Sequence, residues 1–410
     1  MAHRLLSVGL LILAMLISPA PAGAQAPVPF PPQPEDVSWP TDTWEAGEFD
    51  DDVDALALRS LIETAFAADK TELMGETRAL LVVHRGKLVF ERYREGYGPN
   101  SRHVSWSVAK SVTQALVGRA IATGLAIDAD APMPGPWAED DPRAAITWRQ
   151  WLTMTDGLDY REMGALSLFE NDVTDMMFGR GRSDVIGFAA GLAPSAEPGR
   201  RFNYSTAAYH LIANALQQVI GAGDCTLADN RADARSASPG TPCITREMRF
   251  SAWADQVLFN VIGMDPVLEY DAGGTFLGGS LVWASARDFA RFGYLYLRGG
   301  VWEDEQILPE GWVDLARSRG PDARINTYGA GFWLTPPEGQ PARLEGYGVE
   351  LPPHDAFSAQ GHEGQIIWIV PSKDLVIVRL GLMPNTRENW LTLMAWCQSI
   401  AIAFPDVSVP

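Results

Sequence analysis

Strand-forming runs lie near both ends of this 410-residue chain, and most of the sequence between them has a helical pattern. Two β-rich runs at 79–83 and 87–93 flank a short turn, which is typical of a hairpin. Apolar runs suited to strands recur late in the chain, at 329–334, 364–370 and 375–380, and a Pro-Ser-Lys-Asp turn separates the last two. We therefore expect one sheet that takes its strands from both ends of the chain.

Helical patterns occupy the intervening sequence and the C-terminal end. We expect helices at 56–66, 107–124, 148–154, 183–190, 205–220 and 387–403, and one more within 278–297. This order of elements predicts a fold of the α/β (α+β) class, with a mainly antiparallel sheet flanked by helices. A mostly helical lobe is expected as an insertion at about 128–264.

The first 24 residues have the three parts of a secretory signal: a short positive start, an apolar core at 5–17 and a small-residue cleavage site after Ala24. The apolar core is shorter than the about 20 residues that a transmembrane helix needs, and an uncleaved anchor is the alternative. We therefore expect a periplasmic or secreted protein. A proline-rich, extended lead-in is expected at 25–55, followed by one domain at 56–405.

Acidic residues outnumber basic ones by 51 to 32, which gives a formal net charge of −19. Nucleic acids and anionic membranes repel such a charge, so we expect neither as a partner. The sequence holds no second apolar stretch of spanning length, so we also expect no membrane insertion of the mature chain. A small molecule is the expected partner.

The sequence Ser107-Val108-Ala109-Lys110 places a hydroxyl and an amine on the same face of an expected helix. Residues three apart on a helix are neighbours, so the amine can come within reach of the hydroxyl. A neutral lysine can take the proton of the serine, but its pKa of about 10.4 must first be lowered by burial, by nearby positive charge or by a helix dipole. With four lysines and 22 serines in the chain, chance also produces such a spacing. The alternative is a helix-capping serine followed by a solvated lysine.

Two later stretches carry further candidate residues. Tyr204 ends a loop before an expected helix, and it can relay a proton if neighbouring positive charge lowers its pKa of about 10. The alternative is a buried aromatic residue with a satisfied hydroxyl. His362 begins the sequence His-Glu-Gly-Gln, which leads into an expected strand. A strand edge flanked by glycine lets a substrate approach backbone N–H groups that can bind an oxyanion, although a histidine without a catalytic role is the alternative.

Taken in order, Ser107-x-x-Lys110, Tyr204-Ser205-Thr206 and His362-Glu363-Gly364 resemble the motifs of the serine β-lactamase and penicillin-binding-protein superfamily. The resemblance is to its class C-like branch, which includes β-lactamases, D-alanyl-D-alanine carboxypeptidases, esterases and the 6-aminohexanoate-dimer hydrolases. Segments 151–158 and 278–293 also resemble recurrent stretches of this branch, so that the resemblance covers about residues 55–405. It implies a β-lactamase-like fold.

The resemblance also implies a role for each matching residue. Ser107 would be the acylated nucleophile, and Lys110 and Tyr204 would share the proton transfers. His362 would help to hold the substrate or the surroundings of the Tyr204 hydroxyl. The oxyanion hole would be the backbone N–H groups of Ser107 and Gln365, and Gly364 would lie beside it on the substrate-binding edge.

Two positions depart from the pattern of the superfamily. Thr206 stands where an asparagine is usual, which removes an amide that helps to place the lysine and the substrate. His362 stands where β-lactamases have a lysine, which removes the permanent cation that receives the substrate carboxylate. We therefore expect a secreted serine hydrolase that cleaves a small ester or amide through an acyl-enzyme, near the 6-aminohexanoate-dimer hydrolase and esterase end of the branch.

Several alternatives stay open. One is a D-alanyl-D-alanine carboxypeptidase or a weak β-lactamase, and another is a catalytically silent binding or sensing module of the same fold. The six histidines show no ligand spacing such as His-Glu-x-x-His, so we expect neither a metal nor another cofactor. An α/β-hydrolase is disfavoured because the sequence has no Gly-x-Ser-x-Gly.

The three cysteines fit an oxidising compartment. Cys225 and Cys243 bracket a polar segment that is rich in turn-forming residues, and we expect a disulfide between them, although two free thiols are the alternative. In the chain-entropy treatment of cross-links, a loop of this size contributes about 3 kcal/mol to stability. Cys397 lies in an apolar run and is expected to be a buried packing residue.

The disulfide can be tested directly on the secreted protein. We expect Cys225 and Cys243 to resist alkylation under non-reducing, denaturing conditions, and to be found by mass spectrometry in one cross-linked peptide pair. Reduction should release both thiols, while Cys397 should be alkylated after denaturation alone. Alkylation of Cys225 without reductant would contradict the disulfide.

Overall fold

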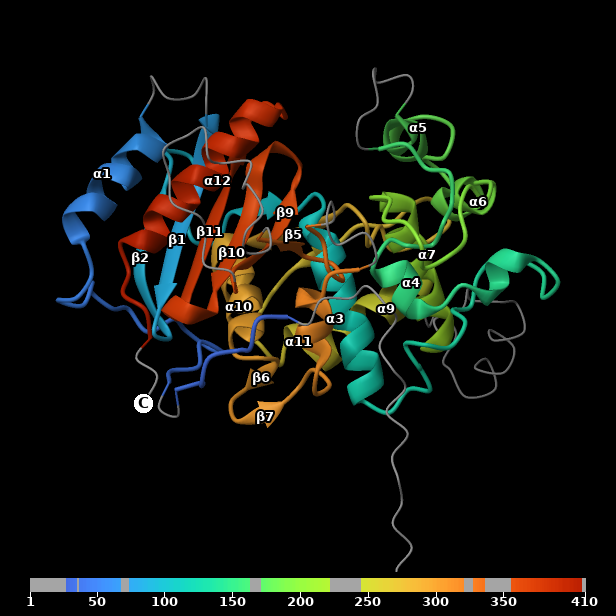
Figure 1. Ribbon diagram of the computed structural model, residues 1–410, viewed down its shortest axis with the longest axis horizontal. Coiled ribbons are helices and arrows are strands. Elements are labelled where there is room, and N and C mark those ends of the chain that lie inside the picture. The colour runs from blue at the N-terminus through green and yellow to red at the C-terminus, as the bar shows by residue number, and fades with distance from the viewer. Residues whose placement is uncertain are drawn as a thin grey trace, which may run out of the picture.

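A six-stranded antiparallel sheet in the order β2-β1-β11-β10-β9-β8 joins the two ends of the chain in the computed structural model (Figure 1). The structure describes residues 27–34, 37–67, 74–162, 171–221, 245–320, 327–335 and 355–407. The strands of the sheet are β1 (Glu76–His84), β2 (Lys87–Tyr93), β8 (Trp333–Leu334), β9 (Phe357–Gly361), β10 (Gln365–Val370) and β11 (Leu375–Leu382). Strands from both ends therefore lie side by side, as expected.

The central pair of strands, β1 and β11, separates two apolar cores. Side chains on a strand alternate between its two faces, so Leu81 and Val83 belong to one core and Leu80 and Val82 to the other. On the second face lie α1 (Ala55–Phe66) and α12 (Arg387–Ile402), and Figure 1 shows α12 running across the strands. On the first face α10 (Ala286–Leu297) contacts β1, β10 and β11. The sheet is thus covered by helices on both faces.

A mostly helical lobe lies beside the sheet, at the right of Figure 1. Its elements are η2 (Pro142–Ala145), α4 (Trp148–Leu152), α5 (Asp172–Phe178), α6 (Val185–Ala190), α7 (Thr206–Val219), α9 (Arg246–Ala254) and the π-helical η4 (Asp255–Phe259). The helix α7 is its central element, because it contacts α3, α4 and α6. The predicted fold class, with a helical lobe inserted into an antiparallel sheet built from both chain ends, is confirmed.

Helix α3 (Val108–Ala122) lies between the sheet and the lobe, and contacts β9 and β10 on one side and α7 and η4 on the other. Twelve of its 15 residues are buried, which explains why its sequence lacks a clear polar face. Close packing requires glycine at position 118, because a Cβ there would lie 2.5 Å from the Trp312 indole nitrogen. The helix ends just before Gly124, whose φ of +89° is left-handed.

The helix expected within segment 278–297 is present in its second part. The segment 278–297 contains strand β5 (Val282–Ser285) before α10 begins. Ser285 forms a capping box with Asp288, which starts the helix there, and the residues before it pair with neighbouring strands instead. The elements not yet placed are β3 (Arg102–Val104), β4 (Val267–Leu268), β6 (Val301–Trp302), β7 (Glu305–Gln306), α11 (Trp312–Arg317), η6 (His362–Gly364) and η7 (Pro371–Lys373).

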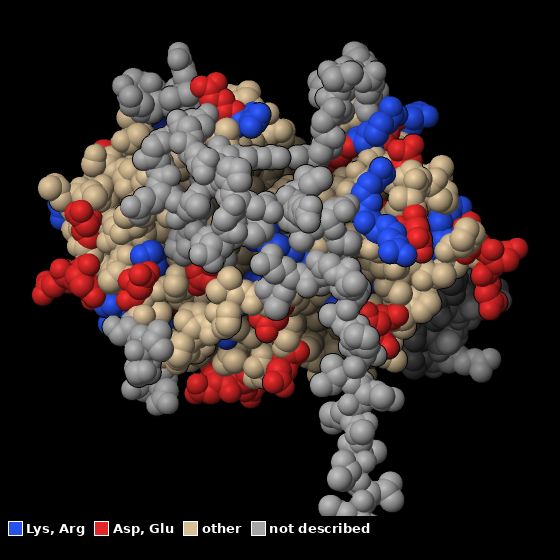
Figure 2. All heavy atoms as spheres, viewed as in Figure 1, with Lys and Arg blue, Asp and Glu red and all other residues tan. Residues whose placement is uncertain are grey.

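The described part of the lead-in, up to Asp54, has no helix or strand of its own. It packs against α10 through Trp39 and Trp44, which contact Tyr294, and through Arg291, which donates to the carbonyl of Pro40. No helix among the described residues is both long and apolar enough to cross a membrane. Figure 2 shows acidic and basic side chains in separate small groups on the described part of one face.

Of the three cysteines, Cys397 lies among the described residues. Cys397 is fully buried in α12, which confirms it as a packing residue, and burial raises the pKa of its thiol to about 12. Cys225, Cys243 and residues 1–24 lie outside the described residues, so the disulfide and the signal stay predictions.

Candidate active site

Ser107 stands at the start of α3, in a turn held between two strands. The backbone N–H of Ser105 donates to the carbonyl of Val282, and the N–H of Val282 donates to Oγ of Ser105 at 2.9 Å. On the other side, a Cβ at Gly361 would lie 2.1 Å from the carbonyl oxygen of Ser105, so β9 reaches the turn only because this residue is glycine. Trp106, directly before the serine, has a φ of +45°. A non-glycine residue in this conformation is strained and persists only where its surroundings fix it.

Lys110 is fully buried one turn along α3. Its Nζ donates to Oγ of Ser107 at 2.8 Å, to Oγ1 of Thr206 at 2.9 Å and to the carbonyl of Gly279 at 2.6 Å. Three acceptors thus meet the three donors of a protonated lysine. The interpretation of Lys110 as a solvated residue is wrong, because none of its surface is exposed.

The surroundings of Lys110 change its acidity. Burial lowers the pKa of its ammonium group to about 8, while the Glu162 carboxylate acts in the opposite direction. A substantial fraction of the lysine is therefore neutral in mildly alkaline solution, and a neutral amine in contact with a serine hydroxyl can accept its proton.

Tyr204 lies against the other side of the lysine, whose Nζ is 4.9 Å from the centre of the tyrosine ring. The ring stacks on Trp333 and meets Tyr328 edge-on, and the Ser107 side chain acts to lower the pKa of the Tyr204 hydroxyl. Proton relay by a tyrosine of lowered pKa requires nearby positive charge, and that condition is not met here. Burial, followed by the charge of Glu162, raises the pKa well above its usual value. Tyr204 therefore stays protonated and is suited to donate a proton.

Glu162 also belongs to this cluster, although no sequence motif indicates it. Its Oε2 accepts from the backbone N–H of Thr206 and its Oε1 accepts from the Thr206 hydroxyl, both at 2.9 Å. Burial raises the pKa of this carboxyl, and the charge of Lys110 opposes the shift. No motif marks Glu162 in the sequence, since its partner lies 44 residues away and the two segments meet only in the folded chain.

The segment that carries Glu162 is tied to the Tyr204 loop by one asparagine. The side-chain amide of Asn203 donates to the carbonyls of Leu158 and Tyr160, and its backbone N–H donates to the carbonyl of Met154. Ser205 then caps α7 by accepting from the N–H of Ala208. Asn203 and Ser205 together place Thr206, the first residue of α7, opposite Glu162.

The structure separates the residues of the third motif. His362 is exposed on the turn between β9 and β10, with its ring edge-on to Trp106 at 5.2 Å, and burial of part of the imidazole lowers its pKa. Gly364 and the side chain of Gln365 contact β11, and the expected role of the Gln365 backbone N–H in an oxyanion hole stays a prediction. A Cβ on Gly364 would lie 2.6 Å from the Arg379 guanidinium, and the Gln365 side chain is bonded to the backbone of Gly381. Gly361, at the end of β9, faces the Ser105–Trp106 turn, because a Cβ there would meet both the Ser105 carbonyl and the Trp106 side chain.

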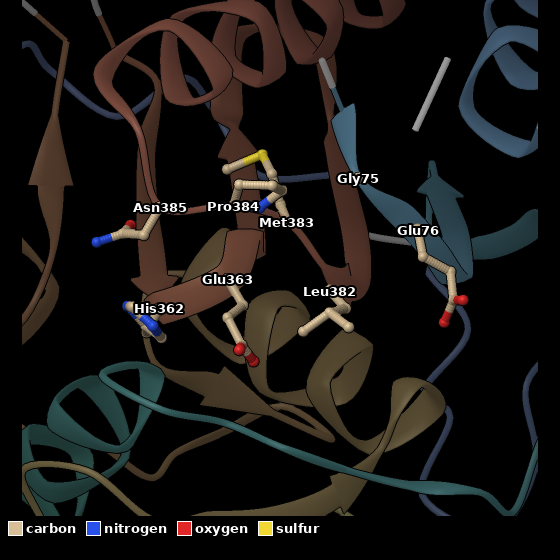
Figure 3. Close-up of a pocket in the computed structure, with 8 residues that line it drawn as sticks. All are labelled: Gly75, Glu76, His362, Glu363, Leu382, Met383, Pro384 and Asn385. Carbon is tan, nitrogen blue, oxygen red and sulfur yellow. The ribbon is translucent and has the colours of Figure 1, made fainter. Parts of the chain in front are cut away.

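A cavity of about 380 Å³ is lined in part by the turn between β9 and β10. Figure 3 shows that its walls come from the start of β1, the turn after β9 and the segment after β11. The lining residues are Gly75, Glu76, His362, Glu363, Leu382, Met383, Pro384 and Asn385. Glu363 links the cavity to the Ser105–Trp106 turn, because its carboxylate accepts from the Trp106 indole N–H at 3.1 Å. Among the described residues, no group of three or more His, Cys, Asp or Glu side chains could hold a metal ion.

This chain is similar to proteins of a known family. The family model described as Beta-lactamase matches residues 70–381. The chain belongs to this family. Among the relatives of this β-lactamase family member is the 6-aminohexanoate-dimer hydrolase of Paenarthrobacter ureafaciens, which is 26% identical over 329 residues, or 77% of this chain and 75% of the relative. Family and relative together make the chain a serine hydrolase.

Solved structures show the same fold. A Bacillus anthracis protein described as a 6-aminohexanoate-dimer hydrolase superposes with a TM-score of 0.59 at 19% identity, covering 92% of this chain and 90% of that one. The octameric penicillin-binding protein homologue of Pyrococcus abyssi superposes with a TM-score of 0.56 at 16% identity, covering 83% and 76% of the two chains. At these identities the likeness is one of fold.

The contact between Gly361 and the nucleophile turn gives a testable prediction. We expect Gly361→Ala to lower both thermal stability and hydrolase turnover, because the new methyl group meets the Ser105 carbonyl, which can move only with the Ser105–Trp106 turn. Overpacking of this kind costs about 1–3 kcal/mol. Gly98→Ala is the matched control, since a Cβ there meets nothing within 4 Å. Equal melting temperature and turnover in Gly361→Ala and the control would contradict the prediction.

Proposed function

We propose that this chain is a secreted serine hydrolase that cleaves a small ester or amide through an acyl-enzyme on Ser107. The observation that carries the proposal is the 2.8 Å contact between Nζ of Lys110 and Oγ of Ser107, in a site where burial lowers the pKa of the lysine to about 8. Secretion is supported by the signal pattern of residues 1–24.

The reaction begins with the attack of Ser107 Oγ on the substrate carbonyl, while neutral Lys110 takes the hydroxyl proton. The oxyanion of the tetrahedral intermediate faces the backbone N–H groups of Ser107 and of Gln365, which follows the turn between β9 and β10. When the intermediate collapses, the leaving alcohol or amine takes the proton of Tyr204. The proton held by Lys110 then restores the tyrosine hydroxyl. Water then attacks the acyl-enzyme and gives a proton to the same pair of groups, which return a proton to Ser107 Oγ as the acid is released.

Two observations support an ester or amide over a β-lactam as substrate. His362 is exposed and has a lowered pKa, so it is no permanent cation for the carboxylate of a β-lactam. The P. ureafaciens relative is named for hydrolysis of the 6-aminohexanoate dimer, a linear amide, which makes linear amides the first compounds to test. The close contact of Ser107 with a base of lowered pKa also favours turnover over a silent binding module.

The mechanism predicts covalent labelling of one serine. We expect a fluorophosphonate probe to modify Ser107 in the wild-type protein, and we expect Ser107→Ala to take no label and to lose hydrolysis of p-nitrophenyl butyrate. Lys110→Ala should lose about 100-fold or more in kcat, because a positioned general base contributes at least that much. The same assay with the 6-aminohexanoate dimer and a chromogenic cephalosporin ranks the substrate classes. Wild-type turnover in Ser107→Ala would overturn the mechanism.

The pH dependence follows from the lowered pKa of Lys110. Only the neutral amine accepts a proton, so activity is lost as the pH falls through the pKa of the lysine and is restored above it. We expect kcat/KM for a neutral ester to rise with a midpoint near pH 8. A midpoint below 6.5 would point to His362 as the base instead, because the pKa of that imidazole is lowered from 6.5.

A further inference from the structure

We infer that Glu162 is a positioning residue of this hydrolase, which orients the Thr206 hydroxyl so that the lone pair of neutral Lys110 is left for the proton of Ser107. The inference rests on the proposed function, because it concerns the base of that reaction. It begins from the double contact of the Glu162 carboxylate with Thr206, whose backbone N–H and hydroxyl each donate at 2.9 Å.

The direction of these hydrogen bonds is what matters. A threonine hydroxyl has one hydrogen and two acceptor positions. Because a carboxylate only accepts, the hydroxyl hydrogen of Thr206 is committed to Glu162, and its oxygen must accept from Nζ of Lys110 at 2.9 Å. Without the carboxylate, the hydroxyl could turn and donate its hydrogen to the neutral amine. It would then occupy the lone pair that the reaction needs.

The remaining contacts of Lys110 complete the argument. A neutral amine has two N–H donors and one lone pair. The carbonyl of Gly279, which can only accept, takes one donor at 2.6 Å, and Thr206 takes the other. The third neighbour, the Ser107 hydroxyl at 2.8 Å, then faces the lone pair. Glu162 is thus the residue that makes Thr206 behave like a carbonyl.

Glu162 is also the charged group that acts on Lys110 within the described residues. Burial and the charge of Lys110 lower the pKa of His210 on α7 to about 3, so this imidazole is neutral, and Tyr204 is neutral because its pKa is raised. The Glu162 carboxylate favours the protonated lysine and opposes the effect of burial. Removal of its charge should therefore lower the pKa of Lys110 further.

Glu162→Gln tests the inference, because glutamine keeps the size but presents an amide N–H to one of the two Thr206 donors. We expect the rise of kcat/KM with pH, here called the acid limb, to move to lower pH. At the pH where kcat no longer changes, kcat should fall about tenfold, while KM changes little. Thr206→Ser should retain the wild-type pH profile and rate. Thr206→Val should lose rate for a related reason, because the Lys110 N–H that Thr206 accepts is then left to turn toward Ser107. Glu63→Gln is the matched control, since this glutamate lies on α1 with 72% of its side chain exposed.

The outcomes separate this inference from the proposed function. If the wild-type protein does not label at Ser107, the proposed mechanism fails. If it labels and turns over, but Glu162→Gln keeps the wild-type limb and kcat or shifts the limb upward, the inference fails and the mechanism stands. Thermal unfolding of each variant identifies loss of folding. If Glu162→Gln does not fold, equal rates in Thr206→Val and Thr206→Ser overturn the inference, and a loss confined to Thr206→Val supports it.

Discussion

The burial of one lysine amine is the interaction on which the rest of the candidate site depends. Taking a charged ammonium group out of water is costly unless it is hydrogen-bonded, and Lys110 finds an acceptor for each of its donors. One acceptor is a helix neighbour, but Thr206 and Gly279 lie 96 and 169 residues away in the sequence. The lysine is therefore functional only in a fold that brings helix α3, helix α7 and the segment before β5 together.

Helix α3 makes this possible because it lies between the two halves of the molecule. Its start is held against the sheet by the close approach of Gly361 to the Ser105 carbonyl, and its length is buried against the lobe. Ser107 thus stands where the strand edge, the lobe and the helix start meet. Strain at Trp106 is sustained by contacts with Glu363 and His362 from the neighbouring hairpin.

The same low-polarity surroundings act in opposite directions on two neighbouring groups. Burial disfavours the charged form of each, so the pKa of Lys110 falls and that of Tyr204 rises. One group becomes a base and its neighbour stays an acid. A pair of titratable groups separated in this way has the properties that acyl transfer needs, because one proton must be removed from the nucleophile and another delivered to the leaving group.

The sequence by itself determined the local features of this protein. The pairing of Ser107 with Lys110 follows from helical spacing, and the hairpins and most helices follow from periodicity and turn residues, because these depend on neighbours in the chain. Tertiary structure decided the protonation chemistry and the partners. Burial raises the pKa of Tyr204, Glu162 joins the site without a motif, and the side chain of Gln365 binds the backbone of β11. Burial and contacts between remote segments arise only in the folded chain, where the lobe packs against α3.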